Sequence, residues 1–175
     1  MRGKELVLSV VLVAMAAVLL GCTGTGGGGG QEDRGTITFT LDGTPKAFSV
    51  YCDGGYIFAV SGIKISGVFC NANQESRSEE VLLYFPGKST GTFSLSADRE
   101  IAGPTVFEHG SISYTEQGGA GFDSDNTGGW HNIVVTSYGA DYIEGTFEGK
   151  VTSPGWDRDH TITNGHFRVK RSADR

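Results

Sequence analysis

The sequence predicts an all-β protein: a single antiparallel β-sandwich or partly closed barrel of about 8–10 strands that follows a cleaved signal peptide. Apolar residues alternate with polar ones at a period of two, as at Ile37, Phe39 and Leu41, which is typical of a half-buried strand. Turn signals recur at short intervals between such segments. After residue 34, no window of about 11 residues has the apolar stripe of a helix.

Each expected strand is a short apolar or alternating segment that ends at a turn. The strands are expected, in chain order, at 37–41, 48–50, 56–60, 63–69, 81–85, 92–95, 105–114, 133–138, 142–151 and 161–170. Turns are expected at Asp42-Gly43, Ser61-Gly62, Pro86-Gly87, Gly118-Gly119, Gly128-Gly129 and Pro154-Gly155. Pro86-Gly87 is interpreted as a hairpin turn. Ile162 and Phe167 have opposite parity, so Asn164-Gly165 between them is predicted to be a β-bulge or a tight turn.

The first 21 residues have the layout of a secretory signal peptide. Arg2 and Lys4 precede an uncharged apolar run at 6–20, and Gly21-Cys22 follows it. This run is shorter than the ~20 residues that a membrane-spanning helix needs. A cysteine directly after the cleavage site is typical of a bacterial lipoprotein, so we expect Cys22 to carry acyl chains such as palmitate as a membrane anchor.

The chain after the signal peptide divides into a tether and a domain. Residues 22–34 begin with the lipidated cysteine and continue as TGTGGGGG, which has almost no side chains to pack and is expected to be a flexible tether. Residues 35–175 are expected to form the β-sandwich. Thr23, not aspartate, follows the cysteine, and by resemblance to Gram-negative lipoproteins this favours the outer membrane of the cell envelope, on its periplasmic or surface face.

The mature chain is acidic. Of 14 Lys+Arg and 20 Asp+Glu, removal of Arg2, Lys4 and Glu5 with the signal leaves 12 and 19, a net charge of −7. An acidic domain repels nucleic acid and anionic headgroups, so we expect no nucleic-acid partner. Attachment to the membrane is therefore expected to rest on the lipid of Cys22 alone.

The two remaining cysteines are expected to form a disulfide. If Ser61-Gly62 is a two-residue turn, the register places Cys52 opposite Asn71, and one bulge at Gly54-Gly55 would move it opposite Cys70. An oxidising compartment favours the bond. The alternative is two buried thiols.

The ends of the domain carry a family resemblance. Gly35-TITFTLDG, Tyr142-IEGTFEGKV and Thr161-ITNGHFRVKR resemble a family of small bacterial lipoproteins, in which a strand with a "DG" turn opens the domain and "GTF" and "TNGxF" strands close it. That family is a domain of unknown function with a β-sandwich-like fold. The resemblance implies the fold and the envelope location, and it transfers no catalytic residue.

Candidate chemistry is sparse. Asp123 and Asp125 alternate before a glycine turn and, with Asn126, are a candidate calcium site. Val134 stands where an EF-hand needs its last carboxylate, and a solvated polar loop is the alternative. The segment 87–91 matches the G-x-S-x-G pattern of a hydrolase, but strands flank it where that motif needs a helix. The four histidines have no zinc-like spacing and are expected at the surface or at strand ends. No cofactor is expected other than this calcium candidate.

These observations favour a non-enzymatic binding or interaction module. Trp130 and Trp156 lie beside glycine-rich loops, where they would contact a protein or glycan partner or else cover an end of the core. One alternative function is a carrier of a small apolar ligand with an internal cavity. Another is a hydrolase that uses Ser89 or a carboxylate cluster.

Overall fold

The structure is a computed structural model that describes residues 34–60, 63–98, 109–155 and 157–172. The signal peptide, Cys22, most of the tether and Trp156 lie outside the described residues. Residues 31–175 form one compact unit. Its described elements are eleven β-strands, and no helix is among them, so the prediction of an all-β fold is confirmed.

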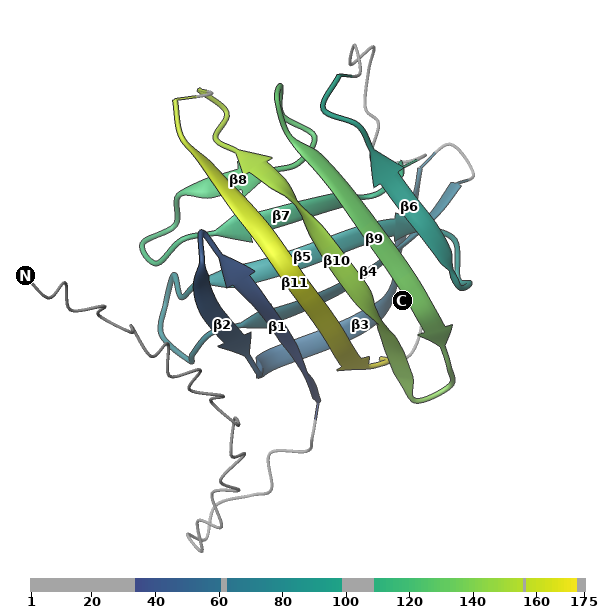
Figure 1. Ribbon diagram of the computed structural model, residues 1–175. Helices are drawn as coiled ribbons and strands as arrows, with labels where there is room; N and C mark the ends of the chain where they lie inside the picture. The colour runs from purple at the N-terminus through teal and green to yellow at the C-terminus, as the bar shows by residue number, and fades with distance from the viewer. Residues whose placement is uncertain (1–33, 61–62, 99–108, 156, 173–175) are drawn as a thin grey trace, which may run out of the picture. The chain divides into compact units, whose positions relative to one another are not determined.

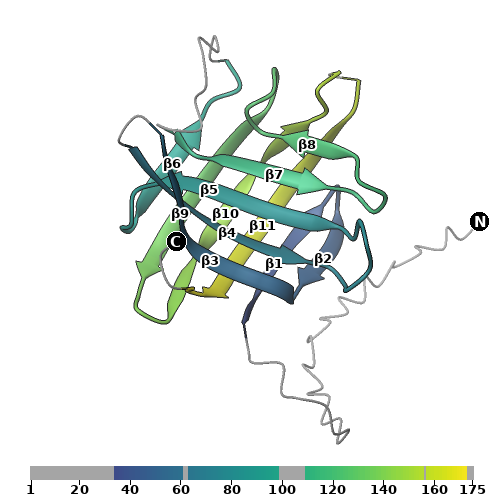
Figure 2. The same ribbon diagram turned by 180° about the vertical axis from the view of Figure 1, so that it is seen from behind.

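The strands form two layers, all of them paired antiparallel (Figure 1). The front layer has the order β2 (Thr44–Phe48), β1 (Gly35–Leu41), β11 (Asp159–Lys170), β10 (Tyr142–Thr152), β9 (Trp130–Tyr138) and β6 (Gly91–Leu95). The back layer has the order β8 (Gly121–Asp123), β7 (Ser111–Thr115), β5 (Glu80–Pro86), β4 (Ile63–Asn71) and β3 (Val50–Val60). Figure 2 shows the back layer, whose strands cross those of the front layer at a steep angle.

The two layers join at two corners, which nearly close the sheet into a barrel. At one corner β10 pairs with β8 through the single pair Thr152↔Asp123. At the other, Gly54 of β3 forms an isolated bridge with Arg171, and Ser172 N–H donates to the Gly54 carbonyl. Among the described residues, β10 and β8 form no pair beyond Thr152↔Asp123, and this gap, here called the seam, contains the candidate site.

The core fills the space between the layers. Alternate residues of each strand point inward, as the period-two pattern predicts. The phenylalanine ring of Phe39, on the front layer, packs against Tyr114 of the back layer with 6.4 Å between ring centroids, and against Phe147 at 5.9 Å. Aromatic side chains therefore cross the sandwich.

A bulge at Asn164 brings both ends of β11 into the core. Asn164 has a φ of 53°, and the register of β11 shifts by one residue against both β1 and β10. Ile162 and Phe167 are consequently both buried, in spite of their opposite parity, so the predicted irregularity is confirmed as a bulge.

Two glycine–phenylalanine pairs seal the β10–β11 contact. Gly145 lies opposite Phe167, and Phe147 lies opposite Gly165. A Cβ atom at Gly145 would lie 2.5 Å from the Phe167 ring, and one at Gly165 would lie 2.6 Å from the Phe147 ring. Each ring therefore covers the glycine across from it, which explains why the sequence repeats a glycine two residues before a core phenylalanine.

The predicted disulfide between Cys52 and Cys70 is present, but the bulge that permits it lies elsewhere. Val60 pairs with Ile63, as expected for a two-residue turn. The register of β3 against β4 then shifts between Tyr56 and Phe58, not at Gly54-Gly55 as predicted. That shift places Cys52 in register with Cys70.

The loop at Pro86-Gly87 is not a hairpin turn, which corrects the prediction. It joins β5 of the back layer to β6 of the front layer, and β6 pairs with β9 instead of with β5. Stacking of Phe85 on Phe93, with ring centroids 5.7 Å apart, holds the two layers together beside this crossover. Sequence spacing alone does not distinguish the two kinds of strand-to-strand loop.

Candidate functional site

The candidate site is a groove of about 760 Å³ at the seam. Its walls are the β7–β8 hairpin, the loop after β8 and the segment that connects β10 to β11. It is lined by Ser113, Tyr114, Thr115, Ala120, Gly121, Phe122, Asp123, Asp125, Asn126, Ser153, Pro154, Asp157 and Arg158. The volume lies within the range of about 300–1,000 Å³ that is usual for ligand sites. The structure thus joins the predicted calcium loop to the loop that contains Trp156.

The groove exists because β10 stops pairing with β8. Thr152 pairs with Asp123, so a straight continuation of β10 would place Pro154 opposite Gly121. Proline has no N–H to donate, and Pro154-Gly155 turns the chain away from β8. The two walls therefore separate at this point.

Hydrogen bonds within the β10–β11 loop hold the outer wall. Ser153 N–H donates to the Arg158 carbonyl at 3.0 Å, and the Ser153 hydroxyl donates to Asp157 Oδ1 at 2.7 Å. The bond from Ser153 is the main cause that lowers the pKa of Asp157 from its ordinary value. Asp157 therefore adds a negative charge to the rim at neutral pH.

Asp123 and its neighbours form the inner wall. The Ser113 hydroxyl donates to Asp123 Oδ2 at 2.5 Å, and Asp125 N–H donates to Asp123 Oδ1 at 2.8 Å. Burial raises the pKa of Asp123, and these two hydrogen bonds lower it in part. The Asn126 amide donates to the Thr152 carbonyl at 2.6 Å, which holds the loop against β10.

These hydrogen bonds account for the arrangement of the predicted calcium loop without a metal. Asp123 uses both carboxylate oxygens within the protein, and the amide of Asn126 is a donor here. In the described part of the chain, no three His, Cys, Asp or Glu side chains gather in a way that would hold a metal ion. The geometry therefore gives no support to the calcium hypothesis.

A charged network lies beside the groove. Arg158 donates to Glu116 Oε1 at 2.5 Å, and its guanidinium lies 5.1 Å from the centre of the Phe122 ring. The ring nitrogens of His160 contact Asp42 Oδ2 at 2.6 Å and Glu116 Oε1 at 3.0 Å. Both contacts form together when the imidazole is protonated, because a carboxylate only accepts. Sequence reasoning missed this network, since its members lie far apart in the chain.

The same network perturbs two acids. Burial acts to raise the pKa of Asp42 and of Glu116, but hydrogen bonds and nearby charge overcome it. His160 lowers the pKa of Asp42, together with the Thr161 N–H, and Arg158 and His160 lower that of Glu116. The network therefore favours ionised carboxylates at this end of the sandwich.

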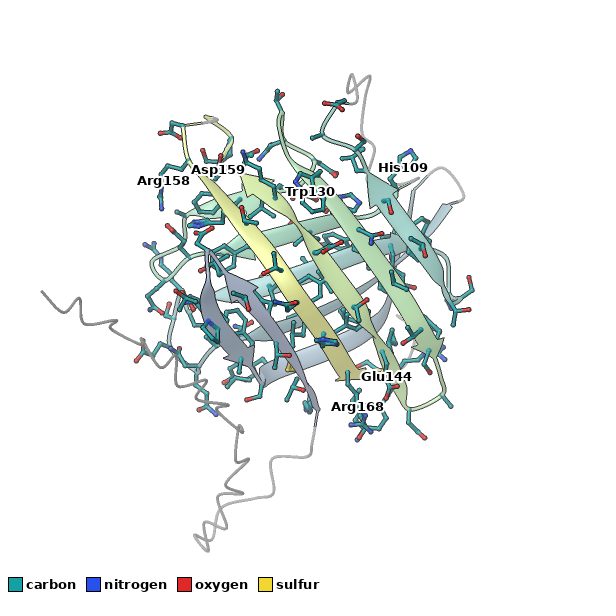
Figure 3. The ribbon with its side chains drawn as sticks, in the orientation of Figure 1. His109, Trp130, Glu144, Arg158, Asp159 and Arg168 are labelled. Carbon is teal, nitrogen blue, oxygen red and sulfur yellow. A yellow bond between two sulfur atoms is a disulfide. The ribbon has the colours of Figure 1, made fainter. Side chains whose placement is uncertain are left out.

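Trp130 does not line the groove. It is half-buried at the start of β9, where it pairs with Lys150 of β10 (Figure 3). Trp156 lies outside the described residues, so the structure does not decide between the two interpretations of that tryptophan. Cys22, the predicted lipidation site, also lies outside them.

His131, the second residue of β9, lies near a strand end as expected but is not at the surface. His131 is buried, with 1 % of its surface exposed. Its Nε2 lies 2.9 Å from the His109 carbonyl, which only accepts, so Nδ1 accepts from the Ser124 hydroxyl at 2.9 Å. Burial lowers the pKa of His131. This serine–histidine pair is enclosed in the core, because Ser124 is 0 % exposed.

No family model, curated protein or solved structure matches this chain. The described residues include no helix long and apolar enough to cross a membrane.

Proposed function

We propose that this protein is a lipid-anchored lipoprotein of the bacterial cell envelope, and that its β-domain is a non-enzymatic binding module. The groove at the seam is the observation that carries the proposal. Two loops form it, one that begins at Asp123 and one that follows β10, and polar loops on a rigid sheet are common places for binding residues. Its carboxylates give a partner polar contacts, and Ala120 and Pro154, both exposed, give apolar ones.

Binding fits the side chains around the groove better than catalysis does. A catalytic serine needs a base within reach and access to substrate. The described serine–histidine contact, Ser124 with His131, is enclosed in the core. Ser89 lies in the crossover loop between β5 and β6, with strands on either side of that loop. The carboxylates of the groove are hydrogen-bonded within the wall, as Asp123 and Asp157 show.

An apolar-ligand carrier is the weaker alternative. Such a carrier needs a cavity between the layers. In this domain, contacts such as Phe39 with Tyr114 and with Phe147 occupy that space. Binding at the surface groove does not require the core to open.

Site-specific photo-crosslinking in intact cells tests the binding function. A photoreactive residue at Ala120 or Pro154, both exposed at the rim, should give a discrete adduct. The matched control places it at Ala140, an exposed position in the turn between β9 and β10. Adducts from the rim alone support the proposal. Equal adducts from Ala140, or none from the rim, would contradict it.

The anchor has a separate test. Cys22→Ser removes the thiol that would be acylated, so the variant should lose its acyl chains by mass spectrometry and leave the membrane fraction. The matched control is Thr23→Ser, which retains the cysteine. If the Cys22→Ser protein remains in the membrane fraction, the anchor does not depend on this residue.

A further inference from the structure

One edge of β8 presents backbone groups to the groove. In the β7–β8 hairpin, Glu116 N–H donates to the Ala120 carbonyl and Ser124 N–H donates to the Ile112 carbonyl. Hydrogen-bonded and non-hydrogen-bonded pairs alternate in an antiparallel ladder, so Gly121 lies at a non-hydrogen-bonded position. Its N–H and C=O therefore point away from β7 and toward the groove, where no described residue pairs with them.

We propose that the groove binds an extended, basic peptide segment of a partner protein, which pairs with Gly121 as an additional strand beside β8. The inference rests on the binding function proposed above and names the class of its partner. Strand addition to an exposed edge is a common mode of peptide recognition, in which main-chain hydrogen bonds give affinity and side-chain sites give specificity.

The position of the additional strand is the one that β10 leaves vacant. Thr152↔Asp123 fixes the register, in which a straight continuation of β10 would have brought Pro154 opposite Gly121. A partner residue with its own N–H supplies the donor that Pro154 lacks. Gly121 is exposed, and no atom lies within 4 Å of where its Cβ would be, so no side chain covers this face of β8.

The carboxylates of the groove favour a partner peptide with basic side chains. Asp123, Asp125 and Asp157 line the groove. Among the described residues of the lining, Arg158 carries the positive charge, and it is already paired with Glu116. A lysine or arginine side chain of the partner would meet carboxylates on both walls, and the net charge of the mature chain adds a long-range attraction for cations.

The protein's own Arg158 illustrates how a cation is held here. Its guanidinium contacts the Glu116 carboxylate and lies over the ring of Phe122. A cation over an aromatic face gains energy from the ring quadrupole. Because the Arg158 side chain is 51 % exposed, a basic residue of the partner can displace it from Phe122 without disrupting the core.

Titration calorimetry with the detergent-solubilised full-length protein tests this. The probe is a short acetylated and amidated peptide of alternating lysine and threonine. Saturable binding is expected, and Gly121→Pro should weaken it about tenfold, because the edge loses its donor. The matched control Gly121→Ala keeps the N–H and should bind as the native protein does. If Gly121→Pro does not fold, the same peptide N-methylated at its backbone replaces the variant and should bind about tenfold more weakly.

Three results would overturn the inference. The first is equal affinity for a peptide of alternating glutamate and threonine, which would remove the charge argument. The second is equal affinity for spermidine, which would show that charge alone suffices without strand pairing. The third is unchanged binding by Gly121→Pro or by the N-methylated peptide. If crosslinks from Ala120 and Pro154 persist in cells in spite of such a result, the binding function stands and only its partner class is wrong.

Discussion

The two edges of β10 differ in how completely they are paired. Along one edge, β10 and β11 pair from Tyr142↔Lys170 to Thr152↔Asp159, with one bulge. Along the other, β10 pairs with β9 and then meets β8 at the single pair Thr152↔Asp123. The paired edge closes the front layer, whereas the opposite edge leaves the groove.

Local chemistry explains this difference. On the paired edge, glycines provide the space that Phe147 and Phe167 fill, so the strands approach closely and the rings are buried. At the seam, Pro154 removes a donor where the ladder would continue. The same strand is therefore part of the stable core and, at its end, one wall of the groove.

The largest expected loss of stability comes from adding a side chain at a glycine where β10 and β11 pair. A Cβ at Gly165 would lie 2.3 Å from the backbone oxygen of Phe147, so Gly165→Val forces strands apart and should lower the free energy of unfolding by more than about 3 kcal/mol. Urea denaturation measures this. Gly121→Val at the seam is the matched control, with no atom within 4 Å, and should change stability by less than about 0.5 kcal/mol. Equal losses for the two variants would mean that the seam is packed as tightly as the core.

The disulfide comes next. It closes a loop across a sequence separation of 18 residues in the β3–β4 hairpin, away from the seam. Replacement of Cys52 and Cys70 together by alanine should lower the free energy of unfolding by about 3 kcal/mol. Crosslinking from Pro154 in the folded variant should stay unchanged. Loss of the crosslink in a folded variant would show that the two regions are coupled.

The buried histidine makes stability depend on pH. Its folded-state pKa lies below the ordinary value of 6.5, so the unfolded chain binds the proton more readily. The contribution of His131 is therefore complete above pH 6.5 and is lost as the pH falls below that value. Denaturation between neutral and mildly acidic pH should show this slope, and His131→Gln should reduce it. His166→Gln, at an exposed position, is the control and should retain the slope.

The smallest effect is expected from the ion pairs beside the groove. Glu116→Gln should cost less than about 1 kcal/mol, because the network is partly exposed. The folded-state pKa values of Asp42 and Glu116 are lowered, so their contribution is present above the ordinary values of 3.8 and 4.5 and is lost as the pH falls through the lowered values. Acid unfolding of Glu116→Gln should be less steep than that of the native protein. If Glu116→Gln and the native protein unfold in acid with the same pH dependence, the network adds no stability.

The sequence predicted structure most accurately where the structure depends on residues close together in the chain. Alternation at Ile37, Phe39 and Leu41 and the turn at Asp42-Gly43 predicted the first hairpin, in which Leu41 pairs with Thr44. Asp42 and Gly43 both have positive φ, as a two-residue hairpin turn of this kind requires. The bulge in β11 followed from parity alone.

The prediction was wrong where pairing depends on distant strands. The loop after β5 has the residues of a hairpin turn, yet Phe93 belongs to the other layer, because β6 buries its apolar face by pairing with β9. The burial of His131 likewise depends on Ser124 and His109, which no spacing rule connects.

The sequence by itself determined the β class, most strand positions and the partner of each domain cysteine, because side-chain alternation, turn residues and hairpin register are local properties. Only the tertiary structure decided which strands share a layer and where the barrel stays open. It also brought Asp123 and Asp157 to one groove from loops that are distant in the chain. The physical reason is that these features depend on non-local burial of apolar faces and on one missing N–H at Pro154, whose effect appears only when β8 lies beside it.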